Sequence, residues 1–438
     1  MGFSHNKKVP LVRFRSTILV LSGLSALTSL IFQFLVIRRI GIGLSSDALV
    51  IGTLLPQFFL IIISSPITSI LIPQLVAEDS KSRKGLYFGL LSAALITATI
   101  LAVIFFVTTP LYIGLITKDS SPESRALIIK LARIQIWGLI PYAAIAIQRS
   151  YNLSRESFYK NEISLLVPNI VFVVFLFYYQ TDIQTLAYIY VFKAILQFIF
   201  LMAWDELVGT NPIVVKVKML EFFSKIKIPM MVSIYLRSGS LIERAILANS
   251  PAGSLTTYNL CQQIMLMIGG ATESSILNPY FVNASSLYKS GLRGEHKLNL
   301  SGHILKLFFG LSCLFIILRS SLQEVLFYAE KSGIIRTSEY SNILLIFTCL
   351  AGVFIFGSLG QLINFSLYSI GRAKEQSIIM GITYAVFTLA KVLSFFTWGI
   401  VGLCIVVSLS FMADFVILYY YYLKYIGLIN TIQKRAEP

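Results

Sequence analysis

The chain has 438 residues, of which 56% are hydrophobic and only 13% are charged, and its mean hydropathy is +0.79. An ordinary soluble domain is roughly 45–50% apolar and about 25% charged. So few charged side chains cannot cover the surface of a 49.0 kDa globule, which excludes a water-soluble enzyme and makes the lipid bilayer the solvent for most of the chain. The net charge of +16 is therefore informative through its distribution along the sequence.

A helix needs about 20 mostly apolar residues to cross the hydrocarbon core of a bilayer. About twelve stretches meet this requirement: residues 16–37, 48–73, 86–110, 127–148, 161–179, 184–204, 226–249, 255–282, 301–319, 340–368, 376–397 and 399–422. The last two are separated only at Trp398-Gly399. The basic start resembles a signal peptide, but the apolar run is too long and has no small-residue cleavage site. We interpret it as a retained first span.

Lysine and arginine accumulate in the cytoplasmic loops of membrane proteins. If the N-terminus is cytoplasmic, the inner segments hold 22 Lys and Arg residues and the outer segments hold 7. This asymmetry predicts a multi-pass protein with an even number of spans and both termini in the cytoplasm. The basic excess is thus a topology signal, and no nucleic-acid partner is needed to explain it.

Landmarks recur at a nearly constant offset across the polar stretch 205–227. Ile37-Arg38-Arg39 is echoed by Ile242-Glu243-Arg244, and Pro73 to Val76 is echoed by Pro279 to Val282. Tyr151 to Arg155 is echoed by Tyr368 to Arg372. The alternative explanation is chance matching in apolar sequence of low diversity. A true repeat with six spans in each half predicts two lobes, residues 1–212 and 213–438, with a substrate site at their interface.

Charged side chains inside a membrane are costly and usually mark a pathway or an ion pair. The seventh span is the densest, with Arg237, Glu243 and Arg244. Arg237 and Arg244 are seven residues apart and share one helix face. Two guanidiniums on one face suit a phosphate or pyrophosphate, because each offers a planar fork of donors. The alternative is that Arg244 reaches the membrane surface while Glu243 caps a neighbouring group.

Other intramembrane charges allow several interpretations. Glu273 could neutralise Arg237, carry a proton, or be a satisfied polar residue. Lys391 and Asp414 lie on adjacent spans, and we expect them to form a structural ion pair. We expect Lys193 to extend toward the membrane surface from near the end of its span.

No catalytic constellation is present, which argues against an enzyme. The three histidines have no carboxylate at metal-ligand spacing, and the four cysteines lie in apolar runs without a CxxC pair. There is no P-loop for ATP hydrolysis. We therefore expect no catalytic residues, no metal and no cofactor, and a transporter or flippase driven by an ion gradient, the membrane potential or consumption of its cargo.

Several segments resemble the MurJ (MviN) family of flippases within the multidrug/oligosaccharidyl-lipid/polysaccharide exporter (MOP) superfamily. They follow the family's order along the chain: Arg39 to Ala48, Leu55-Pro56, Ile72 to Glu78, Asn169, Gln197, Ile242 to Ser254, and Leu367-Tyr368 with Arg372 and Lys374. The resemblance covers residues 30–425. It implies an all-α polytopic fold of the MOP/MATE type, with about twelve transmembrane helices in two pseudo-symmetric six-helix lobes. It also implies alternating access and export of an undecaprenyl-pyrophosphate-linked sugar.

The chain departs from lipid II flippases at positions that those proteins fill with charge. Where those proteins carry a charged pair in the first span, this chain has the uncharged neighbourhood of Gln33. Where they carry an arginine in the eighth span and a basic residue in the tenth, this chain has Gln263 and Gln361. An asparagine of the eleventh span falls at Lys391, whose ammonium could stand where some relatives bind sodium. These departures favour a related glycan, such as an O-antigen, capsule or exopolysaccharide unit, over lipid II.

We therefore expect an inner-membrane flippase for a polyprenyl-pyrophosphate-linked glycan, either a polysaccharide repeat unit or a peptidoglycan precursor. Its candidate substrate-binding residues are Arg237, Arg244, Arg39, Gln33, Gln263 and Gln361. Its candidate ion-coupling residues are Glu273, Glu243, Asp414 and Lys391. Expected partners are the lipid-linked oligosaccharide, membrane lipids and a glycan polymerase. Two alternatives stay open: an organic-cation antiporter of the same superfamily, which the cationic seventh span disfavours, and a non-transporting scaffold.

Overall fold

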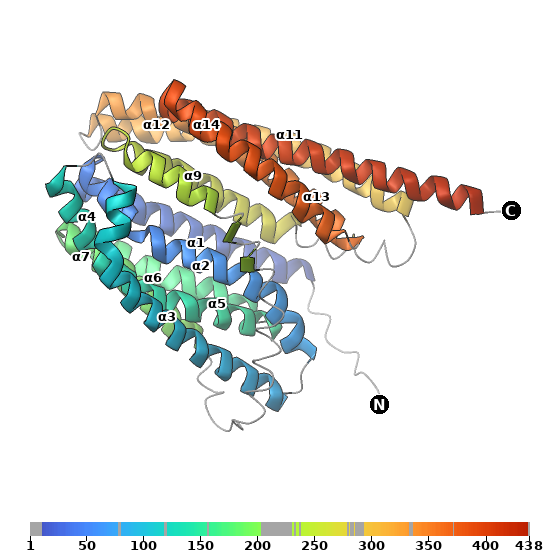
Figure 1. The fold of residues 1–438 in the computed structure, drawn as a ribbon, viewed down its shortest axis with the longest axis horizontal. Coiled ribbons are helices and arrows are strands. Elements are labelled where there is room, and N and C mark those ends of the chain that lie inside the picture. Colours follow the sequence, from blue (N-terminus) through green and yellow to red (C-terminus); the bar gives the residue numbers. More distant parts are fainter. Residues whose placement is uncertain are drawn as a thin grey trace. The chain divides into compact units, whose positions relative to one another are not determined.

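The structure is a computed structural model. It describes residues 11–77, 80–117, 121–155, 157–202, 230–231, 234–235, 238–277, 280, 284, 293–332, 336–370 and 372–436, and these residues form helices and short connections with no strand. The chain divides into two compact units (Figure 1). The first comprises residues 1–40 and 48–237, and the second comprises residues 41–47 and 238–438. The predicted lobe boundary at residues 212 and 213 falls outside the described residues and stays a prediction.

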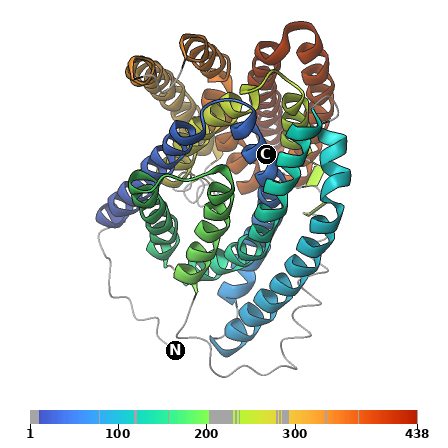
Figure 2. The ribbon, with the colours of Figure 1, turned by 90° about the vertical axis from the view of Figure 1, so that its left-hand side faces the viewer.

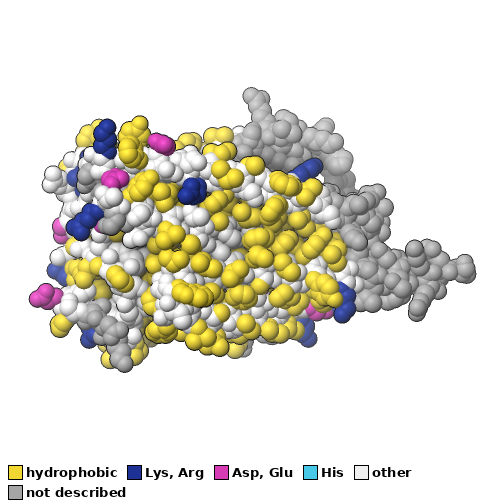
Figure 3. All heavy atoms as spheres, turned by 90° about the horizontal axis from the view of Figure 1, so that it is seen from above, with side chains coloured by type: hydrophobic (Ala, Val, Ile, Leu, Met, Phe, Trp, Pro, Cys, Tyr) yellow, Lys and Arg dark blue, Asp and Glu magenta, His cyan; other side chains and the backbone are white. Residues whose placement is uncertain are grey.

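Many of the described helices are built for a lipid environment. Eight are long and apolar enough to cross a membrane. Large apolar side chains are left exposed on them, such as Leu115 at 82% and Phe396 at 80%. Figure 3 shows apolar side chains across the middle of one face, with charged groups mostly toward its two edges. Exposed apolar surface of this kind marks a contact with lipid or with another protein, and its position on helices of membrane-spanning length indicates lipid. The protein is thus a multi-pass membrane protein, as the composition predicts.

The first unit is a bundle whose helices follow the predicted spans. α1 packs on α6, α3 packs on α5, and α7 packs on both α5 and α6 (Figures 1 and 2). In its core, Tyr87 of α3 stacks on Tyr151 of α5 with ring centroids 4.1 Å apart. Its elements are α1 (Leu11–Ile40), α2 (Leu44–Ala77, of which residues 44–47 belong to the second unit), α3 (Ser80–Ile116), α4 (Pro122–Gln135), η1 (Ile136–Gly138), α5 (Leu139–Ser154), α6 (Phe158–Tyr178) and α7 (Ile183–Leu201).

The fourth span of the first unit is broken in its middle. Between α4 and α5 the chain tightens into the 3₁₀ turn η1. Pro141 lies in the first turn of α5 and has no amide hydrogen, so it cannot continue the helical ladder to the carbonyl of Trp137. The sequence prediction of one span over residues 127–148 thus holds for its position but misses the turn within it.

The second unit contains a helix over residues 238–248, and its other described elements follow this helix along the chain. α13 packs on α14, and α9 packs on α12 and α13. Its fourth span is also broken, because α12 ends at Cys349 and α13 begins at Ala351. The elements are α9 (Ser254–Thr272), the π-turn η3 (Glu273–Leu277), α11 (Arg293–Lys331), α12 (Thr337–Cys349), α13 (Ala351–Ser369) and α14 (Ala373–Ala436).

α14 contains both of the last two predicted spans. Gly399 interrupts it with φ 62° and ψ −148°, outside the helical region. A positive φ is easily adopted only by glycine, which has no Cβ to clash with its own carbonyl. The predicted break at Trp398-Gly399 is confirmed. The prediction of an all-α polytopic membrane fold is confirmed as well.

Candidate functional site

A buried polar cluster lies inside the second unit. Glu243 of the helix over residues 238–248 accepts hydrogen bonds through both carboxylate oxygens. The Lys391 ammonium lies 2.7 Å from its Oε1, and the Tyr258 hydroxyl donates to its Oε2 at 2.6 Å. All three residues are buried: Glu243 is 5% exposed, Lys391 is 8% exposed and Tyr258 is 0% exposed. The two charges are therefore paired and hydrogen-bonded, which is the condition for placing charge in an apolar interior.

This geometry corrects the expected pairing of Lys391 with Asp414. Adjacency of spans along the sequence does not determine which helix faces meet. The helix over residues 238–248 packs on α14, and the hydroxyls of Ser238 and Tyr384 lie 2.7 Å apart at this contact. This packing brings Glu243 to Lys391, whereas Asp414 forms no ion pair with any described residue. Asp414 Oδ1 is buried and has no hydrogen-bond partner in the described part of the chain.

Arg244 lies beside the ion pair. It is half-buried, and its Nη2 donates to Asn259 Oδ1 at 3.4 Å. Its guanidinium is thus held against α9 within the unit. Arg237, the other member of the predicted guanidinium pair, lies outside the described residues. The predicted pairing of Arg237 with Arg244 stays a prediction.

Asp47 has a role that the sequence patterns did not reveal. Its carboxylate accepts from the amides of Gly253 at 2.6 Å and Thr256 at 2.8 Å, and from the Thr256 hydroxyl at 2.6 Å. These groups form the first turn of α9, so Asp47 supplies the acceptor that this helix end lacks. Gly253 enters that turn with φ 93°. An acidic residue at the start of α2 suggests a cap for its own helix, and nothing local indicates that it caps a helix more than 200 residues away.

In the first unit, α1 and α7 bring a cation and two polar groups together. The Tyr190 hydroxyl donates to Gln33 Oε1 at 3.2 Å, and the Lys193 ammonium lies 4.5 Å from the centre of the Phe32 ring. α7 runs from Ile183 to Leu201, so Lys193 is ten residues from its start and eight from its end. The expectation that Lys193 lies near a span end was wrong, because α7 is centred on it. Lys193 has no ion-pair partner among the described residues.

Arg39 has a structural contact. Its Nη2 donates to the carbonyl oxygen of Leu176 at 2.7 Å, near the C-terminal end of α6. Cations are favourable at this end of a helix, where the last carbonyls lack partners. Arg39 is half-buried there. We therefore assign it an anchoring contact between α1 and α6.

The remaining predicted residues lie apart from these contacts. Gln263 is half-buried on α9, and Gln361 is exposed on α13. Glu273 is half-buried and begins the π-turn at the end of α9, a distortion that is frequent at functional sites. In the described ranges, no group of three or more His, Cys, Asp or Glu side chains could hold a metal ion.

The fold is similar to those of solved transporters. A structure of the lipid II flippase MurJ in an inward-closed conformation aligns with a TM-score of 0.79 at 15% identity, covering 93% of this chain and 87% of that one. A MATE multidrug transporter in an inward-facing conformation aligns with a TM-score of 0.74 at 14% identity, covering 93% and 96%. A MOP superfamily transporter from Pyrococcus furiosus aligns with a TM-score of 0.64 at 14% identity, covering 96% of each chain.

A search of curated protein sequences finds no significant match. The profile of the family described as Lipid II flippase MurJ matches residues 36–435, which is nearly the whole chain. This span includes all of the candidate residues discussed above except Gln33. The chain belongs to the MurJ family of lipid II flippases.

Proposed function

We propose that this protein is an inner-membrane flippase that moves a polyprenyl-pyrophosphate-linked glycan across the bilayer by alternating access, with both termini in the cytoplasm. The observation that carries the proposal is the match to the MurJ family over residues 36–435. A pyrophosphate crossing an apolar layer needs cationic partners along its route, because an unpaired charge there is costly. The polar groups of each unit supply such partners.

In the first unit, Lys193 is the phosphate-binding candidate. It lies at the middle of a membrane-spanning helix without an acidic partner among the described residues, and a cation in that position is stabilised by an anionic ligand. Its contact with Phe32 supplies only part of this stabilisation. Gln33 and Tyr190 beside it offer an amide and a hydroxyl for the oxygens of a phosphate or a sugar. Lys193 thus replaces the charge that lipid II flippases carry elsewhere in this half.

In the second unit, we assign the phosphate contacts to Arg237 and Arg244. Glu243 is the single carboxylate beside two cations, Lys391 and Arg244, so these three side chains together keep a net positive charge. Gln263 and Gln361 are neutral amides suited to sugar hydroxyls. Arg39 contributes indirectly by holding α1 against α6. These features favour an anionic cargo over the organic cations of an antiporter.

The pairing of Lys391 with Glu243 also bears on the driving force. An internal ammonium supplies the positive charge that a bound metal cation would otherwise bring to this buried carboxylate. We therefore assign the driving force to the membrane potential or to protons, with Glu273 and Asp414 as candidate proton carriers. We assign the cargo to a polysaccharide repeat unit, such as an O-antigen, and a glycan polymerase as the partner that consumes it.

Transport in proteoliposomes tests the proposal. The purified protein is reconstituted with a fluorescent undecaprenyl-pyrophosphate saccharide, and the fraction of label accessible to a membrane-impermeant quencher is followed over time. Lys193→Ala should slow transport by about 10-fold or more, the value of one charge-assisted hydrogen bond, and Lys193→Arg should restore most of it. The matched control is Lys306→Ala, which removes an exposed lysine of α11. Equal rates for Lys193→Ala and the wild-type protein would remove Lys193 from the route.

The same vesicles test the driving force. Replacing sodium with choline in both compartments should leave the rate unchanged, and Glu273→Gln should make it insensitive to a proton gradient. Sodium dependence would contradict the role assigned to Lys391. No transport of any lipid-linked saccharide by well-folded protein would contradict the flippase itself.

A further inference from the structure

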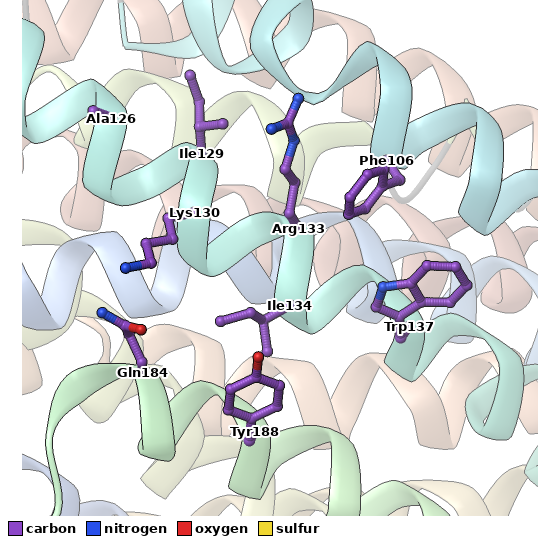
Figure 4. Close-up of a pocket in the computed structure, with 9 residues that line it drawn as sticks. All are labelled: Phe106, Ala126, Ile129, Lys130, Arg133, Ile134, Trp137, Gln184 and Tyr188. Carbon is purple, nitrogen blue, oxygen red and sulfur yellow. The ribbon is translucent and has the colours of Figure 1, made fainter.

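The first unit has a second polar site, separate from Gln33 and Lys193. A cavity of about 550 Å³ lies among α3, the α4–η1 segment and α7 (Figure 4). Its polar lining consists of Lys130, Arg133, Gln184 and Tyr188, and its apolar walls include Phe106 and Trp137. Lys130 extends toward Gln184, and the Arg133 guanidinium lies beside Phe106. None of the residues proposed above for transport lines this cavity.

The two cations of the cavity are not neutralised within the protein. Neither Lys130 nor Arg133 forms an ion pair with any described residue. Arg133 lies over the Phe106 ring, with Cζ 5.1 Å from the ring centre, so its position is fixed by packing. Its Nε is buried and has no hydrogen-bond acceptor in the described part of the chain. A buried donor of this kind can be satisfied by an acceptor that enters the cavity from outside the protein.

The depth of the cavity indicates where that acceptor is found. α7 has 19 residues and is therefore about 29 Å long, close to the thickness of the hydrocarbon core. Gln184 and Tyr188 lie in its first two turns, which places them at the boundary between acyl chains and head groups. Tyrosine is enriched at this boundary, where one side of the ring is wet and the other apolar, and Tyr188 fits that position. Lipid head groups carry their phosphates at this depth.

An apolar surface continues from the cavity toward the bilayer centre. On α7, Phe192 lies one turn beyond Tyr188 and is 56% exposed, and on α3, Val103 lies one turn from Phe106 and is 48% exposed. Both lie on the side of the cavity toward the membrane midplane. A lipid whose phosphate is held by the two cations could therefore lay an acyl or prenyl chain along this surface.

We propose that this cavity binds the phosphate-bearing head group of an anionic lipid, with Lys130 and Arg133 contacting the phosphate, Tyr188 bordering the head group and Trp137 lying on the side toward the lipid chains. The lipid comes from the leaflet at the α3–α4 end of the unit. Two lipids carry this chemistry: an anionic phospholipid of the bilayer, or the polyprenyl pyrophosphate itself after it has been moved. The two occupants would give the cavity different roles, as a regulatory lipid site or as an exit site.

Tryptophan quenching reports on the occupant directly, because Trp137 lines the cavity and the chain has only three tryptophans. A full-length variant with Trp204→Phe and Trp398→Phe keeps Trp137 alone. It is reconstituted into vesicles in which either phosphatidylglycerol or phosphatidylcholine carries brominated chains. We expect brominated phosphatidylglycerol to quench Trp137 more strongly at equal mole fraction. Removing each cation, by Lys130→Gln or Arg133→Gln, should lower this preference by about fivefold, the value of one interfacial cation.

Two controls keep the result specific. A variant with Lys306→Gln and Arg319→Gln removes two exposed cations of α11 and should leave the preference unchanged. A variant that keeps Trp398 alone should show no preference. Equal quenching of Trp137 by the two lipids, or a preference that survives both cavity substitutions, would overturn the proposal. Reversal of the quenching by undecaprenyl pyrophosphate identifies the exit site, and quenching that persists in its presence identifies the phospholipid site.

Discussion

The Glu243 carboxylate and the Lys391 ammonium lie 2.7 Å apart in the interior of the second unit, although 148 residues separate them along the chain. The Tyr258 hydroxyl donates to the other carboxylate oxygen, so contacts from two helices, α9 and α14, fix the position of Glu243. Removing one member of a buried pair leaves an uncompensated charge, whereas removing both leaves none. This asymmetry makes the pair testable.

Lys391→Met should lower the free energy of unfolding by about 3–5 kcal/mol, the usual cost of leaving one buried charge unpaired. The double variant with Glu243→Gln should recover most of this loss, because Tyr258 can still donate to the amide oxygen. Unfolding in mixed micelles measures both changes. Strictly additive losses in the double variant would show that the two residues do not interact.

Asp47→Ala should destabilise the first turn of α9 by about 1–2 kcal/mol, because three donors lose their acceptor. Asp47→Asn keeps one acceptor oxygen and should lose less. Hydrogen exchange of the amides of Gly253 and Thr256 measures the effect locally. Thr185 at the start of α7 serves as the internal reference. Unchanged protection at Gly253 in the Ala variant would contradict the cap.

Gly399→Ala should cost about 1–2 kcal/mol, because alanine is strained at φ 62°. No heavy atom outside the chain neighbours lies within 4 Å of the added methyl group, so the cost is conformational. The matched control is Gly23→Ala in α1, where the space is equally open and φ is not positive. There alanine should be neutral or stabilising. Equal effects of the two substitutions on thermal unfolding would contradict the strain.

The N-terminus of α7 should loosen in acid. Asp182 accepts from the Thr185 amide at 3.2 Å and from the Thr185 hydroxyl, and these hydrogen bonds hold the pKa of the Asp182 carboxyl below its ordinary value of 3.8. A carboxyl whose pKa is lower in the folded state stabilises the fold above its unfolded pKa. The contribution is lost as the pH falls through the lowered folded value. Exchange at the Thr185 amide should therefore accelerate below about pH 4.

Asp182→Asn provides the control for this acid response. The amide has no charge to titrate but can still accept from Thr185. Exchange at Thr185 should then show no acid-induced acceleration beyond the intrinsic pH dependence of exchange. The same acceleration in the Asn variant would place the titrating group elsewhere.

The membrane fold could be predicted from the sequence because hydropathy is a local quantity. Any 20 consecutive apolar residues satisfy the length of the bilayer core, whatever packs beside them. The break between the last two spans was also predictable, since Gly399 is one residue that tolerates the required backbone conformation. The break at η1 was missed, because Pro141 lies in an apolar run whose hydropathy does not change there. The sequence also identified the charged residues within apolar spans, where contact with lipid would be energetically costly.

Only the tertiary structure decided which of these charges meet. The contacts of a helical residue depend on how the helix is rotated and on which helix packs against it, and neither is a property of nearby sequence. Lys391 therefore pairs with Glu243 and not with Asp414 on the next span, and Asp47 caps a helix in a different part of the chain. Lys193 lies at the centre of its helix because α7 begins at Ile183. The sequence by itself determined that charge must be hidden within the bilayer, and packing between distant segments determined where each charge is neutralised.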